Sequence, residues 1–233
     1  MRNNLIQGLE QINTDIIKMC ELIELAIDRA FTAMCTHDFE LAKSVIRYEA
    51  RVNELEKIVE ANCMQILISQ QPVATDLRFV SVALKLVTDL ERIAAQSSDI
   101  SEIATKQVGK EFVSSPTFII TMAGKTMQMI RDATESFVNR DKELAEKVIL
   151  ADDEIDDMFI IVKSTLIDLI NRDKQTGEQA IDFIMISKYL ERIADHAVNI
   201  AEWVIFFITG EHKIDSKLAK VLKEIEENPE EEF

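Results

Sequence analysis

Apolar residues recur at the spacing of an α-helix along almost the whole chain, and helix-breaking residues interrupt this pattern only at intervals of roughly 30 to 35 residues. This spacing predicts long antiparallel helices, each about 45 Å in length at a rise of about 1.5 Å per residue. The 233 residues include only 5 glycines and 3 prolines, too few for the tight turns that many short strands need. We therefore expect an all-α protein with helices at residues 4–35, 38–70, 75–106, 117–139, 141–172 and 178–209, and a shorter helix at 214–226.

Two short motifs mark expected helix ends. Ser115 and Pro116 suit the start of the fourth helix, because serine caps the first turn and proline there loses no hydrogen bond. Gly210 is expected to stop the sixth helix, since glycine readily adopts the left-handed backbone that ends many helices.

The second half of the chain repeats the first. Asp38 and the apolar positions after it correspond to Asp141 and its successors at an offset of 103 residues. Further along, LERIAAQSSDISE at 90–102 aligns with LERIADHAVNIAE at 190–202 at an offset of 100, with seven of thirteen positions identical. The change of offset indicates that the second and third helices are joined differently in the two halves.

This repeat predicts the domain organisation. We expect two tandem, pseudo-repeated three-helix bundles at residues 1–106 and 117–210, followed by a charged C-terminal tail at 211–233. Such an architecture presents two pseudo-equivalent surfaces.

Charge and cysteine usage limit the possible partners and the compartment. The chain has 26 basic and 42 acidic residues, hence a net charge of −16, which is the wrong sign for binding nucleic acid. No segment resembles a signal peptide or approaches the roughly 18 apolar residues of a membrane span, so a cytoplasmic protein is expected. Cys20, Cys35 and Cys63 form no metal-binding or redox spacing, and we interpret them as buried thiols in a reducing compartment.

The second half carries two pairs of carboxylates that stand out by position. Asp152 and Asp156 are four residues apart beside the apolar seam of the fifth helix, and Glu191 and Asp195 have the same arrangement on the sixth. Like charges at this spacing destabilise a helix slightly, and a bridging hard cation such as Mg, Mn, Ca or ferric iron would offset that cost. The alternative is a solvated acidic face, in which Lys188 and Arg192 are near enough to neutralise Glu191.

The corresponding positions of the first half are less suited to a metal. They are Glu49, Asn53, Glu91 and Ala95, and the alanine has no ligand atom. A site there would be vacant or would depend on Glu49 and Glu91 together with Asp99.

Three features together resemble the PhoU family of accessory regulators of bacterial phosphate uptake. They are QPVATDLR at 71–78, LERIADHAVNIAE preceded by DDEIDD at 152–157, and the tandem halves. The resemblance implies two three-helix bundles, frequent homodimerisation and multinuclear metal clusters of iron, or of Mg, Mn or Zn. By position, it assigns these clusters to Asp152, Asp156, Glu191 and Asp195, and in degraded form to Glu49 and Glu91 with Asn53.

The resemblance also implies partners. They are the ATPase subunit of the phosphate-specific ABC transporter and the phosphate-sensing histidine kinase, with any contact to the membrane made peripherally through them. The protein would act as a negative regulator that couples the two. The alternatives are a metal-binding or structural helical bundle that assists a different phosphate permease, and a purely structural dimerising bundle.

No catalytic constellation is visible in the sequence, so we expect a protein that is not an enzyme. A ferritin-like di-iron bundle needs Glu-x-x-His, whereas Glu191 and His196 are five residues apart. Arg78, within QPVATDLR, is expected to pair with a nearby carboxylate or a helix end, and the alternative is a contact with a partner. The apolar run around Trp203, Phe206 and Phe207 is expected to belong to the core.

Overall fold

The computed structural model describes residues 2–107 and 117–211. In this part of the chain the helices are α1 (Arg2–Thr36), α2 (Phe39–Gln70), α3 (Ala74–Gln107), α4 (Thr117–Asn139), α5 (Lys142–Arg172), the 3₁₀ helix η1 (Lys174–Thr176) and α6 (Gly177–Thr209). The predicted all-α fold is confirmed, and each of the six long helices lies within two residues of its expected bounds. The expected helix start at Ser115 and Pro116 and the expected helix at 214–226 lie outside the described residues.

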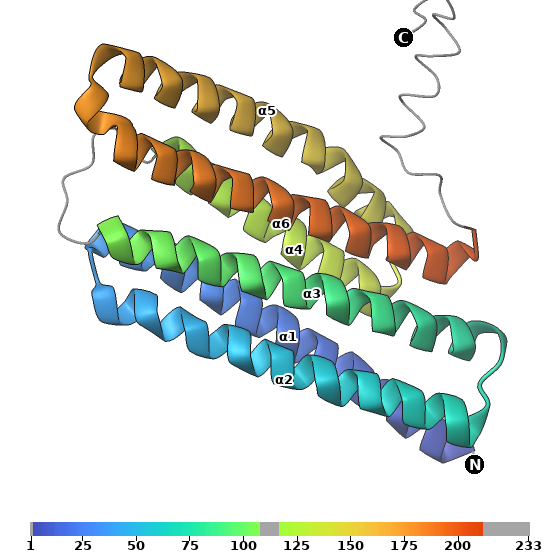
Figure 1. Cartoon of the computed structure of the whole chain (residues 1–233). Coiled ribbons are helices and arrows are strands. Elements are labelled where there is room, and N and C mark those ends of the chain that lie inside the picture. The colour runs from blue at the N-terminus through green and yellow to red at the C-terminus, as the bar shows by residue number, and fades with distance from the viewer. Residues whose placement is uncertain (1, 108–116, 212–233) are drawn as a thin grey trace, which may run out of the picture.

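The six long helices lie nearly along one direction and form two bundles (Figure 1). Helices α1, α2 and α3 make up the first bundle, and α4, α5 and α6 make up the second. Helix α3 packs along α6, and these two helices join the bundles. None of the helices in the described ranges is long and apolar enough to cross a membrane.

A single apolar cluster fills both bundles and the boundary between them. Close to one end of it, the ring of Phe79 from α3 lies 5.6 Å from that of Phe137 on α4 and 5.7 Å from that of Phe207 on α6. Phe207 is therefore a core residue, as expected, whereas Trp203 and Phe206 are half-buried at its edge. Aromatic contacts of this kind bind three helices from both halves into one interior.

The turns between the first two helices of each half have the same construction. His37 and Arg140, exactly one repeat apart, adopt the left-handed backbone with φ of 55° and 53°. The carboxylate of the next residue, Asp38 or Asp141, accepts a hydrogen bond from the backbone N–H three residues later, at 2.9 Å and 3.0 Å. Each aspartate therefore satisfies one of the donors that a helix leaves unpaired at its start.

The third helices begin differently, which accounts for the change of offset. In the first half the linker 71–73 separates α2 from the first turn of α3. In the second half, which the structure describes throughout this region, α5 is followed almost directly by η1. At an offset of 100, Ala74 corresponds to Lys174, so η1 stands where α3 has its first turn. The three additional residues of the first half are therefore the Gln71-Pro72-Val73 linker.

The contacts between α3 and α6 show a pseudo-twofold relation between the halves. Asp89 Oδ1 lies 2.8 Å from His196 Nδ1 and accepts a hydrogen bond of 3.3 Å from Asn199. At the offset of 100, Tyr189 is the counterpart of Asp89, and Asp99 is the counterpart of Asn199. Tyr189 and Asp99 also interact, because the pKa of Tyr189 is raised by burial and then by the charge of Asp99. The two pairs thus occupy equivalent places on the boundary between α3 and α6, although only the pair at Asp89 is joined by a hydrogen bond among the described contacts.

One expectation for the cysteines is wrong. Cys20 and Cys63 are buried, but Cys35 is exposed near the end of α1. Ala33 and Met34 in the same turn are buried, whereas Cys35 follows the exposed Asp28 and Thr32 at helical spacing and therefore lies on the solvent face of α1.

The capping aspartates give a test of the repeated turn. Replacing Asp141 with alanine should destabilise the protein by about 1 kcal/mol, because the hydrogen bond to the start of α5 is lost. Thermal unfolding followed by circular dichroism should show a Tm lower by about 2–4 °C. Asp141→Ser, which keeps a capping oxygen, should stay close to the wild type, and equal Tm values for the alanine variant and the wild type would contradict this account.

Candidate functional site

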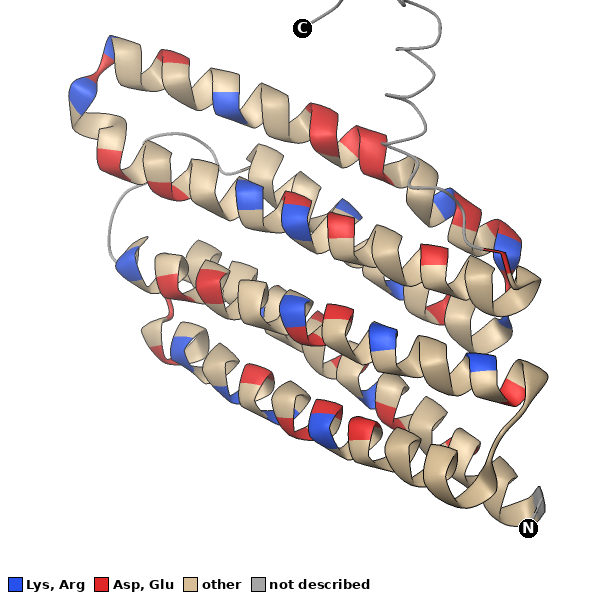
Figure 2. Ribbon diagram, turned by 45° about the vertical axis from the view of Figure 1, so that its right-hand side comes forward, with Lys and Arg blue, Asp and Glu red and all other residues tan. Residues whose placement is uncertain are grey.

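The predicted metal ligands lie along two seams between neighbouring helices, one in each half, and we call these seams the first and the second groove. The second groove runs between α5, which carries Asp152 and Asp156, and α6, which carries Glu191 and Asp195. Asp152 is only 5% exposed, and the other three side chains are half-buried. Figure 2 shows acidic residues following one another along α5. These carboxylates are therefore not a fully solvated face.

A lysine occupies part of this second groove. Lys188 forms an ion pair with Glu191 one turn away on α6. Its ammonium also lies 5.3 Å from the centre of the Phe159 ring on α5, which places Lys188 and Glu191 at the boundary between the two helices. The negative charge of Glu191 is therefore compensated by the protein itself, as the solvated-face alternative expected.

The carboxylates do not converge on one point in this arrangement. Within residues 2–107 and 117–211, no three His, Cys, Asp or Glu side chains are grouped so that they could hold one metal ion. A cation in the second groove would need Glu191 to part from Lys188 and the side chains to approach one another. The metal site therefore stays a prediction.

The first groove, between α2 and α3, holds an acidic cluster that the sequence indicated only in part. Asp99 on α3 lies close enough to Glu102 and to Glu49 of α2 for their charges to act on it. Burial, followed by these two charges, raises the pKa of Asp99, while Arg192 of α6 opposes the rise.

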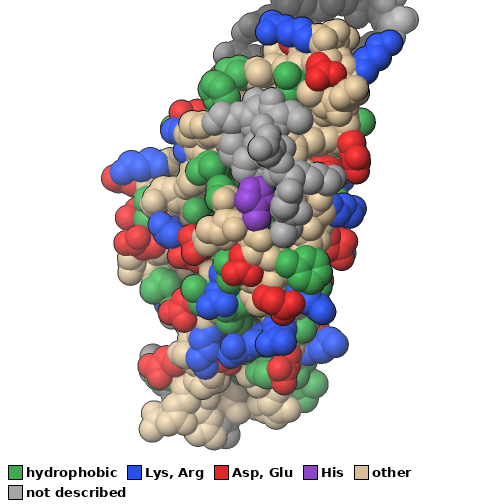
Figure 3. Space-filling model, turned by 90° about the vertical axis from the view of Figure 1, so that its left-hand side faces the viewer, with side chains coloured by type: hydrophobic (Ala, Val, Ile, Leu, Met, Phe, Trp, Pro, Cys, Tyr) green, Lys and Arg blue, Asp and Glu red, His purple; other side chains and the backbone are tan. Residues whose placement is uncertain are grey.

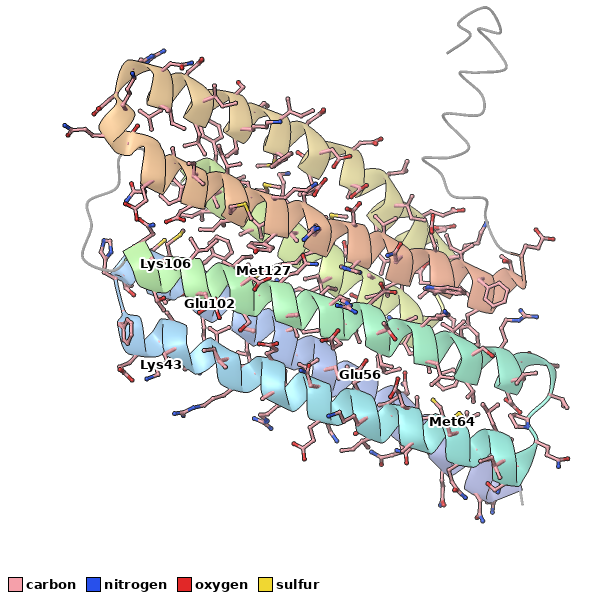
Figure 4. The ribbon with its side chains drawn as sticks, viewed as in Figure 1. Lys43, Glu56, Met64, Glu102, Lys106 and Met127 are labelled. Atoms are coloured by element: carbon pink, nitrogen blue, oxygen red, sulfur yellow. The ribbon has the colours of Figure 1, made fainter. Side chains whose placement is uncertain are left out.

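A second acidic cluster lies further along the same groove. Burial and the charges of Glu91 and Glu60 raise the pKa of Glu56, and Lys57 and Arg92 oppose the rise. Figure 4 labels Glu56 on α2 and Glu102 on α3, the two helices that border the groove. Both like-charge clusters favour a bound proton or cation over a set of bare carboxylates.

Sequence reasoning included Glu49, Glu91 and Asp99 but missed Glu56 and Glu102. The register of two antiparallel helices would have found Glu56, because Glu49 faces Asp99 and Glu56 faces Glu91, so that facing residue numbers sum to about 148. Glu102 follows Asp99 by three residues on α3, a spacing that places both on one face of the helix. The same register sets Asn53 opposite Ala95. The Oδ1 atom of Asn53 is buried and accepts no hydrogen bond from the described part of the chain. At the middle of the first groove, Asn53 therefore offers an amide oxygen while Ala95 offers no ligand atom.

Arg78 lies at a helix end, as expected. Its Nη1 atom donates a hydrogen bond of 3.1 Å to the backbone oxygen of Phe207 near the end of α6, and its guanidinium lies 5.9 Å from the centre of the Phe206 ring. Gly210 ends α6 with a φ of 81°, and a side chain there would approach the Arg78 guanidinium to 2.9 Å. Arginine at this position therefore fastens the start of α3 to the end of α6, where the helix dipole favours a cation. A contact of Arg78 with a partner stays a prediction.

The acidic cluster around Glu56 gives a prediction for stability. Because the pKa of Glu56 is raised in the folded protein, ionised Glu56 destabilises the fold at neutral pH, and this cost disappears as the pH falls and the group takes up a proton. Glu56→Gln should therefore raise the Tm at pH 7, by on the order of 1 °C, and the gain should shrink as the pH approaches 4.5.

Differential scanning calorimetry across this pH range measures the effect. Glu54→Gln, on an exposed side of the same helix, is the matched control and should show a smaller change. A Glu56→Gln variant that melts at or below the wild-type temperature at pH 7 would contradict the assignment.

Comparisons with known proteins identify the same family in both halves of the chain. A family model described as the PhoU domain matches residues 16–104 and 119–204. The phosphate-specific transport system accessory protein PhoU homolog of Clostridium acetobutylicum is 30% identical over 203 residues, which cover 87% of this chain and 93% of that protein. The phosphate-specific transport system accessory protein PhoU of Escherichia coli is 28% identical over 203 residues, covering 87% of this chain and 84% of that protein.

Solved structures show the same fold. The crystal structure of PhoU from Pseudomonas aeruginosa matches with a TM-score of 0.85 at 28% identity, covering 88% of this chain and 99% of that one. The phosphate transport system regulatory protein PhoU from Streptococcus pneumoniae, at 21% identity, matches with a TM-score of 0.83 over 91% of this chain and 100% of that one, and supports the fold alone. Because the family model covers most of each half, and a relative 30% identical is covered almost completely, the chain belongs to the PhoU family.

Proposed function

We propose that this protein is a cytoplasmic regulatory adaptor of phosphate uptake. In this role it couples the phosphate-specific ABC transporter, through its ATPase subunit, to the phosphate-sensing histidine kinase, and it holds the output of the kinase low when phosphate is plentiful. The observation that carries the proposal is the match of both halves to the PhoU family, whose relatives include proteins named as accessory proteins of phosphate-specific transport systems.

The physical character of the molecule supports a role in binding other proteins. Long helices around one continuous core provide rigid outer faces, and rigid faces lose little conformational entropy when a partner docks. The surface alternates between acidic, basic and apolar side chains over the face seen in Figure 3, as expected for transient, charge-guided contacts. We infer a function that is not catalytic, and a contact with the membrane made only through the transporter, because anionic headgroups repel a protein with a charge of −16.

The carboxylate grooves are proposed to bind metal. The ligand set Asp152, Asp156, Glu191 and Asp195 offers only oxygen atoms, which suit iron, Mg or Mn better than the softer sites of zinc. Glu49 and Glu91 are the corresponding proposal for the first half, and Glu56 extends it, since burial and then the charges of Glu91 and Glu60 raise its pKa. A bound cation would neutralise these carboxylates and stiffen the pair of helices that carries them.

Two further parts of the proposal concern assembly. A homodimer is proposed on the family resemblance. The N-terminal and C-terminal bundles offer similar but unequal outer faces, so one chain can contact the transporter and the kinase at different places.

A pull-down tests the adaptor role. Tagged protein should retain the phosphate transporter from membranes that contain its ATPase subunit, and retention should fall at least about tenfold in membranes that lack the subunit. A phosphate-regulated reporter in a strain without this protein should be constitutively active and should be repressed again when the chain is restored. No retention at either high or low phosphate would contradict the role.

Elemental analysis tests the metal proposal separately. The wild type, purified without chelator, should carry bound metal, and the Asp152→Ala/Asp156→Ala/Glu191→Ala/Asp195→Ala variant should carry much less. Lys188→Ala is an informative companion, because removing the lysine that pairs with Glu191 should increase metal retention. Equal metal content in the quadruple variant and the wild type would remove the site from the second groove.

A further inference from the structure

An apolar surface is exposed where α2 turns into α3, at one end of the first bundle. Ile68 and Val73 are each 73% exposed, which makes them the most exposed large apolar side chains among the described residues. Met64, one turn before Ile68, is 51% exposed, and Leu77, one turn after Val73, is 42% exposed. We call these four residues the turn patch, and Figure 4 labels Met64 toward this end of α2.

The sequence around the turn patch lacks charge. Residues 61–75 contain no Asp, Glu, Lys or Arg, and this is the longest such run in the chain. A protein with 29% charged residues ordinarily places some of them at an exposed turn between two helices. A continuous apolar surface without charges is typical of a site where another part of a protein packs.

The equivalent turn of the second half is polar. Ile68 corresponds to Asn171 at the offset of 103, and Leu77 corresponds to Gly177 at the offset of 100. Val73 belongs to the three-residue linker that distinguishes the first half. Of the turn patch, Met64 alone has an apolar counterpart. The two halves therefore differ at this turn in the property that decides whether water or protein covers it.

The C-terminal segment carries an apolar face that needs a surface to pack on. Its apolar residues stand at positions i, i+4, i+7, i+8 and i+11, so a helix over 214–226 places them on one side: Ile214, Leu218, Val221, Leu222 and Ile225. A helix of this length is marginal in water unless its apolar face is covered. The matched family domain ends at residue 204, so this segment lies outside the part of the chain that the family model covers.

The chain leaves α6 beside the turn patch. A side chain at Gly210 would approach the Arg78 guanidinium to 2.9 Å, and Arg78 directly follows Leu77 on α3. Figure 1 shows the end of α6 and the turn between α2 and α3 at the same end of the molecule. Residues 211–213 span at most about 10 Å when extended, which is about the diameter of one helix. A helix that begins at Ile214 can therefore cross the start of α3 and reach the turn patch.

From this placement we propose that residues 214–226 form an amphipathic helix that packs on the turn patch of the same chain. The apolar face of the segment covers Ile68 and Val73 and extends to Met64 and Leu77. The short connection favours this site over the same patch on a second copy, because it keeps the segment at a high effective concentration beside its own patch. The segment is then a cover that any partner using the turn patch has to displace. The inference does not depend on the proposed function.

Hydrogen–deuterium exchange of the full chain, followed by mass spectrometry, measures the contact. Backbone amides within 214–226 should exchange at least about tenfold more slowly than those of an unstructured segment, because the docked helix protects them. Ile68→Glu/Val73→Glu places two charges on the turn patch and should remove this protection. Leu218→Glu/Leu222→Glu makes the reciprocal change in the segment and should remove it as well. Circular dichroism should show that both variants keep the six long helices.

Leu150→Glu is the matched control. Leu150 lies on α5 in the second bundle and is 72% exposed, so the substitution adds the same charge to an equally exposed apolar side chain. The protection of 214–226 should stay at the wild-type level in this variant. It should also stay unchanged when the wild type is diluted about twentyfold, because an intramolecular contact does not depend on protein concentration.

The proposal is overturned if the segment exchanges as fast in the wild type as in the Leu218→Glu/Leu222→Glu variant. It is also overturned if Ile68→Glu/Val73→Glu leaves the protection intact, or if Leu150→Glu removes it to the same extent. Protection that is lost on dilution would show that the segment packs on a second copy. Protection that arises only after addition of phosphatidylglycerol vesicles would show that the segment lies on a membrane surface instead.

Discussion

The packing of α3 against α6 is the contact on which the rest of the molecule depends. Each of these helices is the third of its own bundle, and each buries one side in that bundle and the opposite side against the other helix. A helix with apolar residues on two sides cannot be covered by a single three-helix bundle, so the two halves must share an interior. Polar contacts at Asp89 and His196, and at Arg78 and the end of α6, fix the register of that shared surface.

Sequence reasoning predicted the helices well because the signals that end them are local. The aspartates before α2 and α5, the Gln71-Pro72 break and Gly210 each determine a boundary through the chemistry of one or two residues. The repeat then predicted two bundles, because two segments with the same apolar pattern bury it in the same way. The exposure of Cys35 was missed although the periodicity contained it, because Cys35 stands on the same face of α1 as Asp28 and Thr32 and away from the buried Ala33 and Met34.

The candidate sites were less predictable. Spacing along one helix placed Asp152 with Asp156 and Lys188 near Glu191, but it could not tell that Glu56 would face Glu91 across two helices. That contact depends on the register between α2 and α3, which is set by the length of the connecting turn. Arg78 is a similar case: the sequence suggested a helix end, but only the fold shows that this end belongs to α6, at a separation of 129 residues from its acceptor.

The Gln71-Pro72-Val73 linker gives the molecule a direction. Without it, the backbones of the two halves would be close to equivalent, and only their side chains would distinguish one half from the other. With three residues on one side and a 3₁₀ turn on the other, the backbones differ as well. A receptor with true twofold symmetry would then bind this chain in either of two equivalent orientations, and in each of them a single bound molecule would make the two receptor subunits unequal.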